Sequence, residues 1–142
     1  MPGIRHPLMI NGVPVVTAPA EIDVTTAEQL RLVLLRPAAR KDATVVVDMT
    51  RTRFCDSAGL TVLVRAYKRA VADGGELRLV IPADGAVARI FAITRLDSAI
   101  PLFGSLDEAL AARPAAVTRP SRPQPSAGRR LARQPGLPGR RI

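Results

Sequence analysis

Residues 44–81, TVVVDMTRTRFCDSAGLTVLVRAYKRAVADGGELRLVI, decide the fold of this chain. The β-branched run at 44–49 is typical of a strand buried on both faces of a parallel sheet, and residues 76–81 predict another strand. Between them a helix is expected to begin near Ser57 and to stop at Gly74-Gly75. Its apolar stripe follows helical spacing and consists of Leu60, Leu63, Val64, Tyr67 and Val71. Strand, helix and strand in this order predict a right-handed parallel crossover.

Two further strands are expected before this unit. Residues 8–10 lead into Asn11-Gly12, a favoured hairpin turn, and residues 13–23 follow as a β-branched segment. Pro14 and Pro19 lie within that segment, and proline lacks the N–H that a central strand would donate. The sequence therefore predicts a strand over 13–23 that lies near a sheet edge.

The helix after these strands has recognisable ends in the sequence. Thr25-x-x-Glu28 has the form of a capping box, in which a side chain at each position accepts from the other's backbone. Proline disfavours helical backbone before it. We therefore expect the helix to run to about Arg36 and to be stopped by Pro37.

The C-terminal third continues the alternation of helix and strand. A helix is expected after Asp84, residues 99–103 predict a short strand, and Ser105-x-x-Glu108 caps a last helix through about Ala112. These elements predict an α/β fold, with one mixed sheet of four or five strands and about four helices in a single domain over 1–112. The turn after Met49 would lie at the carboxyl end of a parallel strand, where ligands and partners bind in such folds.

The charge of the chain is concentrated at its C-terminus. The net charge is +9, but residues 113–142 contain eight Arg and no acidic residue. Removing those eight from the 21 Lys and Arg leaves 13 basic residues against 12 acidic ones in the rest. The end segment also holds six of the 13 prolines and has no apolar periodicity. It predicts a disordered basic tail, which either has no function or contacts an acidic partner, nucleic acid or an anionic membrane.

The composition excludes several kinds of site. A single cysteine, Cys55, rules out an intramolecular disulfide and a cysteine-cluster metal site. No charge-free apolar run approaches the roughly 18 residues of a membrane span. Aromatic residues make up only 3% of the chain, so stacking platforms for single-stranded nucleic acid are nearly absent. We expect no metal, no cofactor and no small-molecule substrate, in a protein of the reducing cytoplasm.

Ser57 has three interpretations from the residues alone. A catalytic serine needs a positioned base, and His6 is the only histidine, while C-D-S-A-G differs from the G-x-S-x-G elbow. A helix cap is the simplest interpretation for Asp56 or Ser57 and stabilises by roughly 1 kcal/mol. A phosphorylation switch is the third, because the N–H groups and dipole at a helix start tolerate an anion.

Three stretches in order resemble a known family. AEIDVTTAEQLR (20–31), VVVDMTRTRFCDSAGLTVLVRAYKRAVADGGELRLV (45–80) and PADGAVARIFAITRLDSAIPLFGSLDEAL (82–110) are similar to the STAS domain, specifically to bacterial anti-sigma factor antagonists. The resemblance covers residues 8–112, and D-S-x-G-L within this frame is its most specific element.

The resemblance implies a function without catalysis. The chain would bind an anti-sigma factor of the serine-kinase type and so free a sigma factor for transcription. Phosphorylation on Ser57, using ATP held by that kinase, would release the partner, and a phosphatase acting on phospho-Ser57 would restore binding. The implied partner-binding residues are Asp23, Asp56, Ser57, Ala58, Gly59, Leu60 and Thr61, with Gly59 permitting close approach and Leu60 anchoring the helix.

The chain also departs from the family pattern. Ala20 stands before the Glu of the first motif, where the family usually has Gly. Arg51 and Arg53 make the loop before the serine unusually basic, as solvated surface or as a contact to an acidic partner or the phosphate. Rival functions are a STAS subunit of another assembly, such as a transporter or a stressosome-like complex, and nucleic-acid binding through the tail.

Overall fold

The structure is a computed structural model that describes residues 6–112. Its main sheet has the strand order β1-β2-β4-β6-β7. β1 pairs antiparallel with β2, and the other neighbours pair in parallel. These strands are β1 (Leu8–Ile10), β2 (Val13–Thr17), β4 (Thr44–Asp48), β6 (Glu76–Val80) and β7 (Leu102–Phe103). The five-stranded mixed sheet confirms the predicted fold class.

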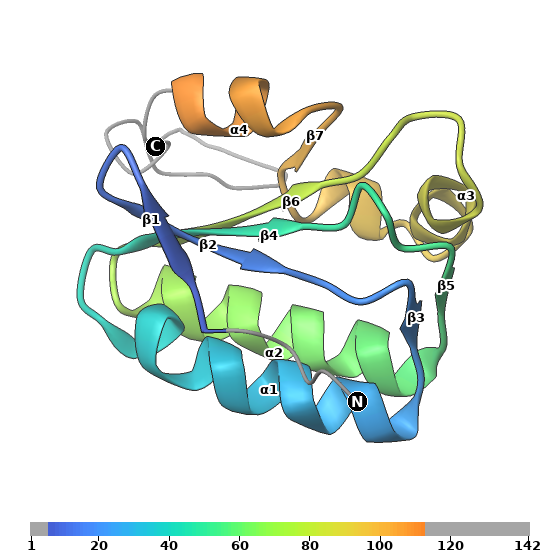
Figure 1. Cartoon of the computed structure of the whole chain (residues 1–142), viewed down its shortest axis with the longest axis horizontal. Coiled ribbons are helices and arrows are strands. Elements are labelled where there is room, and N and C mark those ends of the chain that lie inside the picture. The colour runs from blue at the N-terminus through green and yellow to red at the C-terminus, as the bar shows by residue number, and fades with distance from the viewer. Residues whose placement is uncertain (1–5, 113–142) are drawn as a thin grey trace, which may run out of the picture.

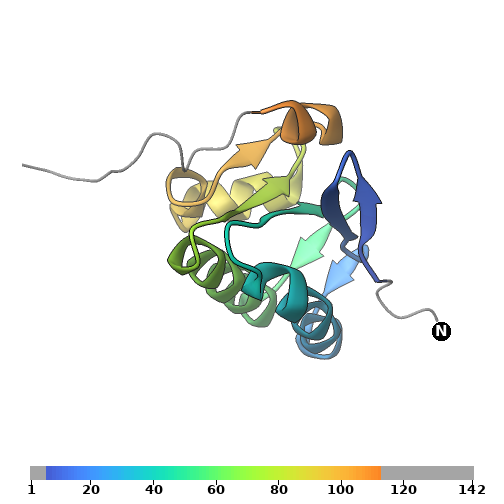
Figure 2. The same cartoon turned by 90° about the vertical axis from the view of Figure 1, so that its left-hand side faces the viewer.

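Helices cover both faces of the main sheet, which lies between them in Figures 1 and 2. α1 and α2 lie on one face, α4 covers the other, and α3 lies at one end beside β5. Their bounds are α1 (Val24–Ala39), α2 (Ser57–Ala72), α3 (Ala86–Ile93), the 3-10 helix η1 (Leu96–Ser98) and α4 (Leu106–Ala111). Within residues 6–112, no helix has both the length and the apolar character of a membrane span.

The strands bury alternate side chains on opposite faces, as the pleat requires. On the α1 and α2 face, β4 and β6 contribute Val45, Val47, Leu77 and Leu79 to the larger core cluster. On the α4 face, Val46 and Val80 pack with Val15 and Ala109. Burial on both faces explains the continuous apolar run of β4.

A buried ion pair lies on the α4 face, in β6. Glu76 Oε1 accepts from the Arg78 guanidinium, and both side chains are almost fully buried. Arg78 Nη1 also donates to the carbonyl oxygen of Ala109, and its guanidinium lies 5.7 Å from the Phe103 ring centroid. Arg78 therefore ties α4 to the sheet by satisfying a carbonyl of its last turn.

Several predicted boundaries were wrong. Residues 13–23 do not form one strand: β2 ends at Thr17, and Glu21–Ile22 form a separate strand, β3, outside the main sheet. α1 runs through Pro37 to Ala39, because a proline so near the end removes only one hydrogen bond of the helix. The predicted strand over 99–103 is shortened to β7, because the N–H groups of Ala99 and Ile100 donate to the Leu96 carbonyl oxygen and so continue the turn of η1.

The C-terminal tail, residues 113–142, lies outside the described residues. Its predicted disorder, and the domain division at residue 112, stay predictions.

In α2, Val71 was predicted to be core but is 48% exposed, and Ala70 is buried in its place.

Candidate switch site

The site is built on a second, two-stranded sheet. β3 (Glu21–Ile22) pairs in parallel with β5 (Phe54–Cys55), with Ile22 opposite Cys55. The Asp56 N–H then donates to the Ile22 carbonyl oxygen over 3.0 Å. Each strand leads directly into a helix, so Asp23 and Asp56 hold equivalent positions at the starts of α1 and α2. This pairing brings the two strand-to-helix turns together.

Asp23 is the N-cap of α1. Its Oδ1 accepts from the backbone N–H groups of Thr25 and Thr26, both over 3.0 Å, and its own N–H donates to Thr26 Oγ1 over 2.8 Å. The capping box therefore joins Asp23 to Thr26, and the prediction that joined Thr25 to Glu28 was wrong. The hydrogen bond from the Thr26 backbone is the main cause that lowers the pKa of Asp23. Its exposed carboxylate stays ionised near neutral pH.

Asp56 is the N-cap of α2. Its Oδ1 accepts from the N–H groups of Ala58 and Gly59, over 2.9 and 3.2 Å. The cap is thus Asp56 and not Ser57, which settles the choice that the sequence left open. Ser57 becomes the first residue of the helix.

The Ser57 hydroxyl is exposed and makes no hydrogen bond with any residue in the described part of the chain. A nucleophilic serine would need a base within hydrogen-bond reach, and residues 6–112 place none there. Nor do residues 6–112 hold a cluster of His, Cys, Asp and Glu side chains that could bind a metal ion. By contrast, the Thr61 hydroxyl donates to the Ser57 carbonyl oxygen over 2.8 Å.

Gly59 lies where α2 packs most closely on the two-stranded sheet. A Cβ atom at this position would stand 2.6 Å from Ile22 Cγ2 and 2.7 Å from Cys55 Sγ. The absence of a side chain therefore lets the start of α2 approach β3 and β5. Ala58 and Leu60, on either side, are half-buried against the main core.

Cys55 is buried beneath this contact. Burial, together with the neighbouring Asp56 charge, raises the pKa of the Cys55 thiol to about 11. The thiol is therefore protonated near neutral pH, and Cys55 is a core residue and not a nucleophile.

The loop before β5 is held in place by its backbone and by one buried side chain. Thr52 is 7% exposed, and its hydroxyl donates to the Pro19 carbonyl oxygen over 2.8 Å. The Arg53 N–H donates to the Ala20 carbonyl oxygen over 2.7 Å. The loop before β5 is thus hydrogen-bonded to the loop before β3, although Ala20 stands where the family usually has Gly. The side chains of Arg51 and Arg53 are exposed.

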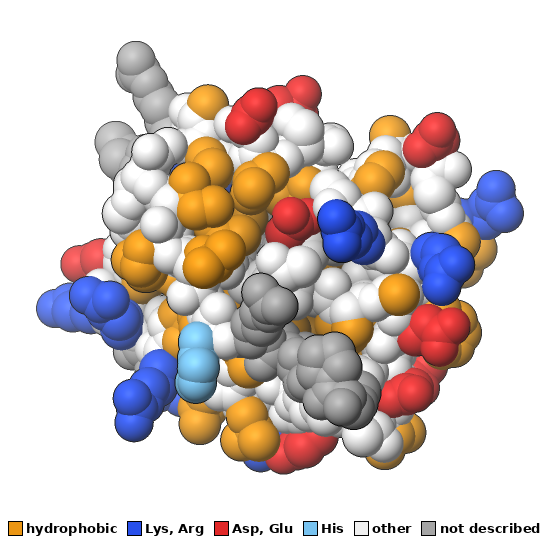
Figure 3. Space-filling view, in the orientation of Figure 1, with side chains coloured by type: hydrophobic (Ala, Val, Ile, Leu, Met, Phe, Trp, Pro, Cys, Tyr) orange, Lys and Arg blue, Asp and Glu red, His pale blue; other side chains and the backbone are white. Residues whose placement is uncertain are grey.

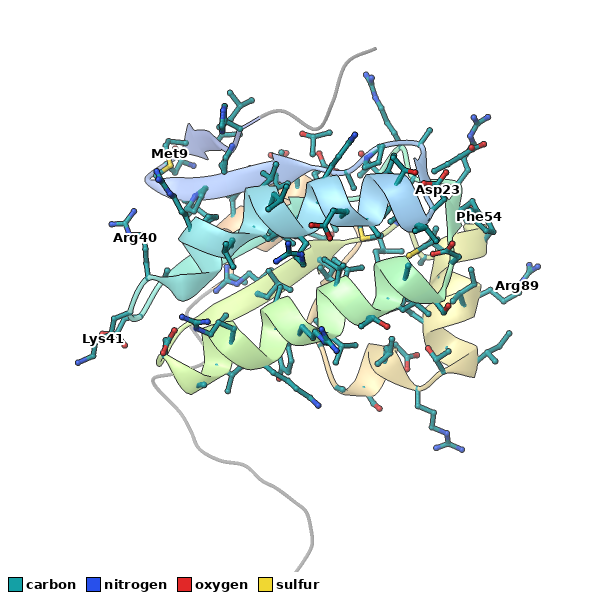
Figure 4. The ribbon with its side chains drawn as sticks, turned by 90° about the horizontal axis from the view of Figure 1, so that it is seen from below. Met9, Asp23, Arg40, Lys41, Phe54 and Arg89 are labelled. Carbon is teal, nitrogen blue, oxygen red and sulfur yellow. The ribbon has the colours of Figure 1, made fainter. Side chains whose placement is uncertain are left out.

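Sequence reasoning missed Phe54, which is 48% exposed at the site. Strand alternation contained the signal: Cys55 is buried, so its neighbour in β5 points the other way. Figure 4 shows Asp23, Phe54 and Arg89 at one end of the molecule, with Arg40 and Lys41 at the opposite end. α3, which carries Arg89, packs against β5.

Thr61, one turn into α2, also lines a groove of about 230 Å³ between α1 and α2. This volume is below the roughly 300 Å³ at which pockets begin to enclose a drug-sized ligand. Among the predicted partner-binding residues, Asp23, Ser57 and Thr61 are exposed, whereas Asp56, Ala58 and Leu60 are half-buried and Gly59 is buried. Their role in partner binding stays a prediction.

Comparison with known proteins identifies the family. The model of the STAS domain matches residues 8–109. An anti-sigma factor antagonist from Mycobacterium paratuberculosis has a similar structure, with 31% identity and a TM-score of 0.63 over 71% of this chain and 85% of that chain. This chain therefore belongs to the STAS domain family, and the resemblance noted in its sequence is confirmed.

Two more distant structures share the fold. An anti-sigma-factor antagonist (STAS) domain protein from Planctomyces limnophilus has 24% identity and a TM-score of 0.65, over 77% of this chain and 96% of that chain. A putative anti-sigma factor antagonist from Thermotoga maritima has 19% identity and a TM-score of 0.61, over 73% and 89%. No curated protein sequence matches the chain.

Proposed function

We propose that this chain is an anti-sigma factor antagonist that acts by partner switching on Ser57. In the unphosphorylated state it binds an anti-sigma factor of the serine-kinase type in the cytoplasm, which frees a sigma factor for transcription. Phosphorylation of Ser57 by that kinase releases the partner, and a phosphatase restores the binding state. The chain itself has no catalytic role and holds no ATP.

The observation that carries this proposal is the exposed, unbonded hydroxyl of Ser57 at the first position of a helix that Asp56 already caps. Phosphorylation there breaks no hydrogen bond among residues 6–112 and buries nothing. A phosphate adds about −1.5 to −2 charges at neutral pH, which helix N-terminal N–H groups tolerate. The modification would change the surface and leave the fold intact.

Two other hydroxyls, those of Thr61 and Ser98, are less suited to this role. Thr61 Oγ1 donates to the carbonyl oxygen of Ser57, and Ser98 Oγ donates to that of Arg95 over 2.9 Å. Phosphorylation at either position would break a hydrogen bond that the fold makes. This difference favours Ser57 as the acceptor.

The test is calorimetric binding of the anti-sigma kinase to wild type, Ser57→Ala, Ser57→Asp and the phosphorylated protein, with Ser98→Ala as the control. Ser57→Ala should fold, accept no phosphate and bind constitutively. Ser57→Asp should bind at least tenfold more weakly, about 1.4 kcal/mol, and the phosphoprotein more weakly still. Ser98→Ala should accept phosphate and bind as wild type. Phosphate mapped by mass spectrometry only to another residue would refute the assignment.

The rival of a STAS subunit in another assembly makes a different prediction in the same experiment. It expects no measurable binding of the wild-type chain to an anti-sigma kinase under any phosphorylation state. That result would reject the proposed function even if Ser57 proved to be phosphorylated.

A further inference from the structure

Arg51 and Arg53 belong to the arginine loop, which we define as residues 49–53. The loop is fixed at both sides: Asp48 Oδ1 accepts from the Thr50 N–H over 3.0 Å, and Thr52 is buried against Pro19. The backbone of Arg53 is bonded to Ala20. A loop held this firmly presents its two exposed guanidinium groups at little further cost in conformational entropy.

The two guanidinium groups of the arginine loop have no carboxylate partner among residues 6–112. The ion pairs found there join Arg31 to Glu28, Arg69 to Asp73, and Arg78 to Glu76. Arg51 and Arg53 flank the exposed Phe54 on its N-terminal side. They therefore place unpaired positive charge within three residues of an exposed apolar side chain at the candidate switch site.

Charges of both signs lie at this end of the molecule. On the right-hand side of Figure 3, the end that carries β3, β5 and α3, Lys and Arg side chains lie between an acidic side chain above them and a group of acidic ones below. Glu21 of β3 is opposite Phe54 in register, and Asp23 follows two residues later. Charges of both signs at separate places on a surface help to fix the orientation of a partner.

Phosphorylation at Ser57 constrains the charge of that partner. A phosphate adds negative charge, so a basic facing surface would bind the phosphorylated chain more tightly. Release requires a facing surface that is acidic, or one that desolvates the phosphate without compensation. The arginine loop is a feature at this end, together with Arg89 of α3 (Figure 4), that would attract an acidic surface before phosphorylation.

We infer that the arginine loop and Phe54 form the docking surface for an acidic patch on the anti-sigma factor, with an apolar contact to Phe54 at its centre. This inference rests on the proposed function. Arg51 and Arg53 draw the acidic patch to the site, and a phosphate on Ser57 repels the same patch. The two arginines and the phosphate thus act in opposite directions on the same partner surface: the arginines attract it and the phosphate repels it.

The test measures association and dissociation rates of the full chain with its anti-sigma factor at about 50 and 300 mM salt, where screening differs strongly. Arg51→Ala/Arg53→Ala should lower the association rate at least tenfold at low salt, change dissociation by less than about threefold, and flatten the salt dependence. Arg51→Gln/Arg53→Gln, which keeps more of the side-chain stems, should behave in the same way. A circular-dichroism melt of each variant checks that the fold is kept.

Arg40→Ala/Lys41→Ala is the matched control, because it removes the same charge at the opposite end of the domain (Figure 4). It should change the association rate less than twofold. Ser57→Asp should weaken binding more at low salt than at high salt, since repulsion is screened and desolvation is not.

Three results would overturn the inference. If wild type binds and Ser57→Asp weakens binding, but the loop variants match the control, the inference fails while the proposed function stands. If the loop variants lose affinity for duplex DNA and not for the anti-sigma factor, the arginine loop is a nucleic-acid contact instead. If wild type does not bind the anti-sigma factor at all, both the inference and the proposed function are rejected.

Discussion

Gly59→Ala tests whether close packing at the start of α2 holds the switch site together. The new methyl group would stand 2.6 Å from Ile22 Cγ2 and 2.7 Å from Cys55 Sγ, so atoms must move. Ile22 is 0% exposed and β-branched, which leaves its methyl group little freedom to yield. Overpacking of a core typically costs about 1–3 kcal/mol. Alanine in place of glycine in a helix returns about 0.5–1 kcal/mol.

The net expectation is a loss of about 0.5–2 kcal/mol in the free energy of unfolding, measured by urea denaturation. Gly104→Ala is the control, because its Cβ would meet nothing nearer than Glu108 Oε1 at 3.6 Å, an ordinary contact. It should change stability by less than about 0.5 kcal/mol. Combining Gly59→Ala with Cys55→Ala removes one of the clashing atoms, so the double variant should lose less than the sum of the two single losses. A Gly59→Ala protein as stable as wild type, or strictly additive losses, would refute the packing argument.

Two further predictions concern buried groups. Arg78→Ala should lower the free energy of unfolding by about 3–5 kcal/mol, because it leaves the Glu76 carboxylate buried without this partner, and thermal or urea denaturation will measure it. Glu76→Gln/Arg78→Met should recover part of that loss, and an Arg78→Ala protein of wild-type stability would contradict the account. Cys55 should react with iodoacetamide at pH 8 about a hundredfold more slowly in the native chain than in the unfolded chain, since its pKa rises from 9.0 to about 11. The pKa of Cys55 is higher in the folded state than in the unfolded state, so the neutral thiol favours the native state. This contribution to stability should be complete below about pH 9 and should be lost as the pH rises toward 11. A Cys55→Ala protein should lack this decline.

The sequence predicted those elements whose periodicity is long or regular. Residues 44–48 and 76–80 form the expected strands, and α2 begins at Ser57, where the apolar stripe indicated. The predicted ends of helices and strands were wrong where a local sequence signal competed with packing. Thr25-x-x-Glu28 matches a capping-box pattern, yet Asp23 stands earlier in the chain and is the better acceptor for the first free N–H groups.

The role of the candidate site stays a prediction, and its construction was not predicted from the sequence. Asp56 and Ser57 were chosen from their position between a strand and a helix, and Asp23 from the family resemblance. The two-stranded sheet that brings them together has only two residues in each strand, too few for alternation to reveal. The exposure of Phe54 follows from its alternation with the buried Cys55, but a strand of two residues is too short for that alternation to stand out in the sequence.

The pairing of β3 with β5 also determines which forms of the chain carry the proposed switch site. Residues 22 and 55 are 33 positions apart, and they meet only when the intervening helix and strand have folded. A synthetic peptide spanning 50–65 would contain Ser57 and its Asp56 cap but would lack Asp23 and the Ile22 carbonyl that receives the Asp56 N–H. The surface around Ser57 therefore belongs to the native state alone. A kinase that reads this surface, and not the local sequence, would pass over nascent or unfolded copies of the chain.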